Sequence, residues 1–127
     1  MLVAGTALWM MSGCASEPQW MRYEVCFGLS VDSGRTPVTE EQWREFRDAE
    51  IAPRFPDGFT LCPGEGFWRS GTKTYLEPAK MLLVVAPDTE ETRKKLTEIS
   101  AAYARRFLQE SVLEVRTPVT VDFHRFP

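Results

Sequence analysis

The chain has 127 residues, of which 43% are hydrophobic and 26% charged, and its formal net charge is −3. This length suits one domain with one core, and the composition excludes a fibre or a disordered chain. Lys and Arg residues are scattered among Asp and Glu, so the clustered positive charge that binds nucleic-acid phosphates is missing. We expect no nucleic-acid partner.

Residues 1–14 differ in kind from the rest, because they are uncharged, apolar or small, and end at Cys14. Such a stretch is too short to span a bilayer and is typical of the apolar region of a signal peptide. Met11-Ser12-Gly13-Cys14 resembles the bacterial lipobox, whose cysteine becomes lipidated. No basic residue precedes it, which a start codon assigned too late or a true lack of targeting would explain. An N-terminal strand or helix with an incidental cysteine is the alternative.

We therefore expect a lipoprotein-type signal over residues 1–14, a tether over 15–20 and one domain over 21–127. The protein is then exported and anchored to the bacterial cell envelope, and its contact with a membrane is made through the lipid on Cys14.

Residues 21–31 alternate between apolar and mixed side chains, which predicts a first strand. Thr39 and Gln42 form a capping box, so a helix begins there, and Pro53 stops it. A short second strand is expected over residues 59–62, interrupted by the proline and glycines of 63–66. A hairpin tip follows at 70–73.

Residues 80–86 are continuously apolar, as in a central strand covered on both faces. A second helix begins at Asp88 or Thr89 and runs to about Phe107, with apolar residues at helical spacing. Residues 112–123 alternate again, and Pro118 places this last strand at a sheet edge because proline donates no hydrogen bond.

The order strand, helix, strand, strand, helix, strand predicts an α+β, ferredoxin-like βαββαβ sandwich. Right-handed crossovers give a four-stranded antiparallel sheet of order 4-1-3-2, with two helices on one face. Cys26 and Cys62 then lie about 9–10 Å apart, on strands separated by a third, beyond the roughly 7 Å that a disulfide allows. We predict two unpaired thiols; a shift of the strand end at Cys62 is the alternative. The helix-free sheet face stays apolar, and we expect a homodimer to form through it.

The sequence holds no Ser/His/Asp set, phosphate loop or metal-spaced cluster, and its one histidine, His124, lies three residues from the end. We expect no metal and no cofactor. Arg54 and Arg69 lie beside aromatic residues or proline. One interpretation is structural pairing with a carboxylate such as Asp57, Glu77 or Glu110. The other is an anion-binding pocket formed by Arg54, Arg69, Trp68 and Tyr75.

Several segments together resemble one bacterial family, namely Pro53–Thr60 (PRFPDGFT), Trp68-Arg69, Glu77–Lys80 (EPAK) and Arg105–Leu113 (RRFLQESVL), with Trp43 and Tyr103. They resemble the domain of unknown function numbered 3574, found in small exported or lipid-anchored proteins, over about residues 22–123. Phe67, Cys26 and Cys62 depart from that pattern. The resemblance supports the predicted fold and the predicted location at the cell envelope, and it implies no activity.

Two functional hypotheses follow. The favoured one is a non-enzymatic envelope module that binds a small anionic or organic ligand or a protein, since no acid/base pair or nucleophile stands out. The alternative is a dimeric α/β-barrel-type enzyme acting on a small organic molecule. The candidate ligand-binding residues are Arg54, Trp68, Arg69, Tyr75 and Glu77.

Overall fold

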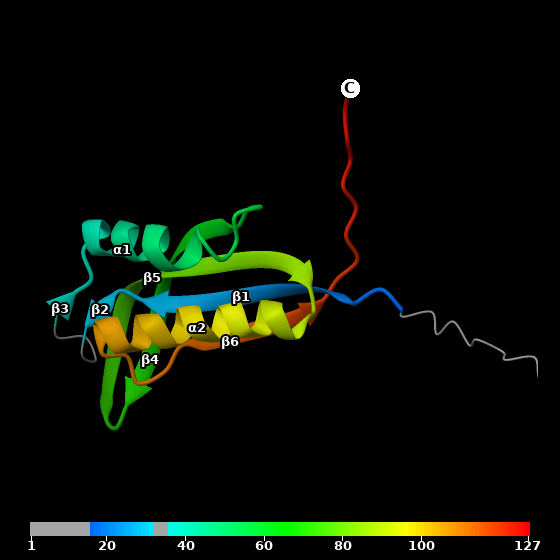
Figure 1. Ribbon diagram of the computed structural model, residues 1–127. Coiled ribbons are helices and arrows are strands. Elements are labelled where there is room, and N and C mark those ends of the chain that lie inside the picture. Colours follow the sequence, from blue (N-terminus) through cyan, green and yellow to red (C-terminus); the bar gives the residue numbers. More distant parts are fainter. Residues whose placement is uncertain (1–15, 32–35) are drawn as a thin grey trace, which may run out of the picture.

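The computed structural model describes residues 16–31 and 36–127, and Figure 1 shows the arrangement of its elements. The predicted signal segment with Cys14 lies outside the described residues. In chain order the elements are β1 (Trp20–Gly28), β2 (Ser30–Val31), β3 (Thr36–Pro37), α1 (Glu40–Phe46), a π-helical segment (Arg47–Ile51), β4 (Thr60–Ser70), β5 (Lys73–Pro87), α2 (Glu90–Phe107) and β6 (Leu113–Pro118).

The fold is α+β, with a four-stranded antiparallel sheet of order β4-β5-β1-β6 and two helices. The apolar run 80–86 lies in β5, which has a neighbour on each side, so its central place is confirmed. The strand that carries Pro118 lies at one edge, as predicted. A separate two-stranded ribbon joins β2 to β3.

The second strand is longer than expected, because β4 runs unbroken from Thr60 to Ser70 through Pro63 and Gly64. It pairs with β5 along its whole length. An edge strand has a neighbour on one side only, so a residue without an amide hydrogen is tolerated at an outward-facing position. The predicted interruption at residues 63–66 is therefore wrong, and the predicted hairpin tip is confirmed at Gly71-Thr72.

The last strand is shorter than expected, because β6 ends at Pro118 rather than at Phe123. Its partner β1 begins at Trp20, whose carbonyl accepts a final hydrogen bond from the Val119 amide at 3.0 Å. Beyond this point no residue of β1 is left to pair. The remaining residues run away from the sheet as an extended segment (Figure 1).

Both helices begin at the threonines that the sequence offers as N-caps. Thr39 and Gln42 form the predicted capping box, and the Thr89 side chain accepts from the Thr92 amide. The first helix passes into the π-helical segment and ends within a turn of Pro53. The second ends at Leu108, which adopts the left-handed conformation with φ 52° and redirects the chain toward β6.

An aromatic cluster fills the core between the helices and the sheet. Phe27 of β1 lies 5.5 Å from Trp43, 5.9 Å from Phe46 and 4.7 Å from Tyr103, measured between ring centroids. All four rings are buried. Because Phe27 contacts rings from both helices, α1 and α2 cover the same face of β1.

Tyr23 extends this face toward the other end of β1, where its hydroxyl donates to Asp88 at 2.8 Å. Burial raises the pKa of Tyr23 to about 12, and the hydrogen bond to Asp88 adds to this shift. Asp88 also accepts from Arg93 at 2.6 Å. These contacts fix the start of α2 against β1.

The opposite side of the sheet, here called the open face, carries no helix. Side chains alternate along strands, so this face holds the neighbours of the buried residues of β1 and β5. It includes Trp20, Arg22, Glu24, Cys26, Thr60, Cys62, Met81, Leu83, Val85, Leu113, Val115 and Thr117. Leu113 is 61% exposed, Val85 43% and Val115 41%.

Cys26 and Cys62 pair in register with opposite sides of Met81, and both are free cysteines. The predicted unpaired thiols are confirmed, because β5 separates their strands. Among the described residues, no helix has the length and apolarity needed to cross a membrane.

Candidate functional site

A pocket of about 320 Å³ lies at one end of the open face. The last residue of β1, Gly28, pairs with Ala79, so the rest of the β4–β5 hairpin continues past β1 as an arm, residues 65–78 (Figure 1). The pocket lies between this arm, the end of β1 and the loop from α2 to β6. It is lined by Cys26, Gly28, Ser30, Gly66, Phe67, Trp68, Glu77, Ala79, Gln109, Glu110, Ser111 and Leu113.

The carboxylate of Glu77 is held in the pocket by one hydrogen bond and by close packing. It accepts a hydrogen bond of 2.8 Å from Trp68 Nε1. A Cβ added at Gly28 would lie 2.5 Å from Glu77 Oε1, so the carboxylate occupies space that only a glycine leaves free. A carboxylate held by one donor and closely packed on its other side is pre-organised toward a ligand.

The arm orients Trp68 through a second aromatic residue. Trp68 and Tyr75 are cross-strand partners in the register of β4 and β5. Their rings stack with centroids 4.5 Å apart and planes at 18°. Stacking of this kind restricts the indole ring, so its N–H stays directed at Glu77.

The opposite wall of the pocket comes from the loop after α2. Gln109 donates from its side chain to the carbonyl of Ser30 and to that of Phe107, the latter at 2.9 Å. These bonds tie the loop to the segment after β1. Glu110 and Ser111 thereby line the pocket across from the arm.

The charged side chains that line the pocket all have the same sign. Two lining residues, Glu77 and Glu110, carry carboxylates, and among the described residues none that lines the pocket is basic. The charge on Glu77 also affects a core residue below the pocket, Tyr103, whose hydroxyl donates to the Gly28 carbonyl at 2.6 Å. Burial raises the pKa of Tyr103, and the charge on Glu77 adds to the rise.

Cys26 lines the same pocket as a thiol rather than a thiolate. Its partial burial raises its pKa, and the nearby carboxylate of Glu24 raises it further. An activated cysteine nucleophile needs the opposite shift. Within residues 16–31 and 36–127, no three His, Cys, Asp or Glu side chains gather in a way that could hold a metal ion.

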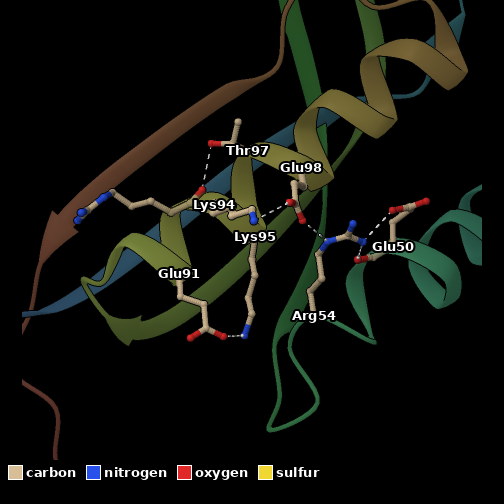
Figure 2. A network of polar contacts seen from close by, with 8 residues as sticks. Glu50, Arg54, Glu91, Lys94, Lys95, Thr97 and Glu98 are labelled. Carbon is tan, nitrogen blue, oxygen red and sulfur yellow. Dashed lines mark hydrogen bonds and ion pairs between the residues drawn. The ribbon is translucent and has the colours of Figure 1, made fainter.

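Of the five candidate residues, the structure brings together Trp68, Tyr75 and Glu77. Arg54 lies on the helix side of the molecule (Figure 2), where it bonds Glu50 at 2.8 Å and Glu98 at 3.3 Å. The carboxylates predicted as its partners, Asp57, Glu77 and Glu110, are therefore not the ones it pairs with. Arg69 follows Trp68 on β4, so its side chain points to the opposite side of the arm. Neither arginine lines the pocket.

The sequence did not predict the pocket wall formed by Gln109, Glu110 and Ser111. It also did not predict that Gly28 leaves room for the Glu77 carboxylate. The available signal is the polar Gln-Glu-Ser stretch directly after an apolar helix end. Gly28 lies in an otherwise regular strand pattern, and a glycine there often marks close approach of another group.

Solved structures with a similar fold include two of one enzyme. A phage SAM lyase in complex with S-methyl-5'-thioadenosine matches with a TM-score of 0.62 and 15% identity, over 80% of this chain and 82% of that one. A phage SAM lyase in the apo state matches with a TM-score of 0.59 and 16% identity, over 83% of this chain and 92% of that one. At this identity the likeness shows the fold.

The hypothesis of a non-enzymatic binding module is corrected by this finding, because both structures named above are of an enzyme. The sequence favoured that hypothesis only because no acid/base pair or nucleophile stood out. The findings support the alternative, an enzyme acting on a small organic molecule, better.

No curated protein matches the chain. The family described as "Protein of unknown function (DUF3574)" matches residues 22–123, which is nearly the whole folded domain. The segments that carried the resemblance, PRFPDGFT and RRFLQESVL, lie inside that range. The chain belongs to the DUF3574 family.

Proposed function

We propose that this protein is an enzyme that acts on a small, positively charged organic molecule bound beside Glu77. The observation that carries the proposal is the Glu77 carboxylate, held by Trp68 at 2.8 Å in a pocket whose charged lining residues are both acidic. Such a pocket attracts cations. The indole ring of Trp68 adds to the attraction, since cations bind over aromatic rings.

Sulfonium nucleosides are the substrate class that we propose. The support is the fold likeness to phage SAM lyase, one structure of which holds S-methyl-5'-thioadenosine. S-adenosylmethionine carries positive charge on its sulfur and its amino group, which suits two carboxylates at opposite walls. Its flat adenine ring suits a pocket lined by the aromatic side chain of Trp68.

The chemistry that fits is cleavage of a carbon–sulfur bond. The electron pair of that bond stays on sulfur, which becomes a neutral thioether. Glu77 takes a proton from the carbon next to the one that leaves sulfur, and the C–H electron pair becomes a carbon–carbon double bond. The proton then passes from Glu77 to water, so the products are the thioether, an unsaturated fragment and one proton.

Incubation of the purified chain with S-adenosylmethionine tests this proposal. We expect S-methyl-5'-thioadenosine to form faster than in a heat-treated sample of the same protein, measured by liquid chromatography and mass spectrometry. The heated control is needed because the sulfonium compound decays in water by itself. Equal rates in both samples would exclude this substrate class.

We further propose that the fold is the ferredoxin-like split βαβ arrangement. Numbered among themselves in chain order, the four strands of the larger sheet follow the order 4-1-3-2 when counted from β6. The β2–β3 ribbon and the π-helical segment are additions to that plan. Both crossover helices cover one face, which supports this classification.

We also propose that the protein is exported and lipid-anchored through Cys14. The apolar segment before Cys14 and its lipobox-like ending support this. In a bacterium fed an alkyne-bearing fatty acid, we expect the full chain to be labelled and the Cys14→Ser variant to stay unlabelled. Cys26→Ser is the matched control and should keep the label; labelling of Cys14→Ser would contradict the anchor.

A further inference from the structure

The open face joins the pocket to a wider surface that is mostly apolar. Cys26 and Leu113 belong to both, so the pocket is a hollow at one end of this face. Three of its aliphatic residues are exposed to solvent, Leu113 by 61%, Val85 by 43% and Val115 by 41%. An apolar sheet face of this kind marks a contact surface.

The charges on this face are self-complementary. Arg22 and Glu24 lie two residues apart on β1, therefore on the same face, and their side chains are paired at 3.0 Å. Arg22 remains 48% exposed and Glu24 24% exposed. Among the open-face residues described here these two alone are charged, one of each sign, near the middle of β1. A second copy, turned to run antiparallel, would place its Glu24 against Arg22 and its Arg22 against Glu24.

We propose that two copies of this chain pair through their open faces, with a twofold axis crossing β1 between Arg22 and Glu24. In an isologous pair the same patch serves both copies, which an Arg/Glu pair beside the axis satisfies. Four strands about 4.8 Å apart and at most about 30 Å long span a flat area of roughly 580 Å² per copy, so this face matches an interface somewhat smaller than the standard one of about 800 Å² per partner.

This arrangement has a consequence for the pocket. With the axis between residues 22 and 24, the Trp20 end of one copy lies over the Cys26 end of the other, where the pocket opens. Trp20 is on the open face by its alternation with Met21 and contacts Phe123 edge-to-face at 5.9 Å. The second copy thus covers the opening of the pocket with an aromatic pair.

Measurement of the mass of the full chain in solution tests the pairing, and it does so independently of any activity. We expect twice the chain mass of 14.5 kDa by light scattering after gel filtration. Val115→Lys places a charge on the open face outside the pocket and should give a monomer. Leu108→Lys is the matched control, since Leu108 is 61% exposed at the end of α2, and should leave the dimer unchanged.

The charge pair tests the orientation. Arg22→Glu brings four negative charges together at the axis and should give a monomer, while Arg22→Glu combined with Glu24→Arg should restore the dimer. A monomeric wild type, a larger ring, or a Val115→Lys variant that still dimerises would overturn the proposal. Failure of the double variant to restore the dimer would overturn the twofold arrangement. Since mass is the readout, these outcomes are distinct from a failure of the proposed reaction.

Discussion

Replacement of Glu77 with glutamine is expected to lower the rate of S-adenosylmethionine cleavage by about 10²- to 10⁴-fold, the usual effect of losing a general base. The amide matches the carboxylate in shape, and its oxygen can still accept the hydrogen bond that Trp68 Nε1 donates to Glu77 at 2.8 Å in the wild type. It has neither the negative charge nor the basicity. The rate of S-methyl-5'-thioadenosine formation is the measurement.

Glu65→Gln is the matched control for this variant. Glu65 lies on the same arm as a partner of Pro78 and does not line the pocket, so its loss should leave the rate within about twofold. A Glu77→Gln enzyme with wild-type rate would remove Glu77 from the reaction even if the substrate is correct. An equal loss in both variants would indicate a general effect of the arm's charge.

Replacement of Phe27 with alanine is expected to lower the free energy of unfolding by about 3–5 kcal/mol, as for other buried Phe side chains. Phe27 is fully buried and contacts Trp43, Phe46 and Tyr103. The cavity would lie between both helices and β1, where no flexible side chain can refill it. Domains of this size have a total stability of about 5–15 kcal/mol, so the variant should be marginally folded.

Urea unfolding followed by tryptophan fluorescence measures this change, because Trp43 lies beside Phe27. Phe67→Ala is the control, since Phe67 is 75% exposed, and it should shift the free energy of unfolding by at most about 0.5 kcal/mol. A loss below about 1 kcal/mol for Phe27→Ala would mean that the aromatic cluster is not the centre of the core.

Much of the fold could be predicted because local signals and packing agree. Thr39 and Thr89 are followed by helix-period residues, and the run at 80–86 suits only a central strand. The errors arose where pairing overrides local signals. Pro63 and Gly64 indicate a break, yet pairing with β5 keeps β4 extended. Residues 119–123 alternate like a strand, yet no part of β1 remains to pair with them.

The site could be predicted only in part, because it depends on the register of the arm and on the loop after α2. Trp68, Tyr75 and Glu77 were selected from one stretch of sequence, and the strand register brings them together. Arg54 was selected for its aromatic surroundings, but its partners are carboxylates on helical segments that no local pattern could identify. Gln109 reaches Ser30 across 79 positions of sequence, which no spacing rule detects.

The placement of two prolines bears on how this protein avoids aggregation. Pro63 lies on β4 and Pro118 on β6, the two edge strands of the sheet. Each interrupts the row of hydrogen-bond donors that an added strand from another molecule would need, which is how natural sheets resist edge-to-edge growth. Continuous fibre formation through either edge is therefore disfavoured, and contact between copies is left to the faces of the sheet.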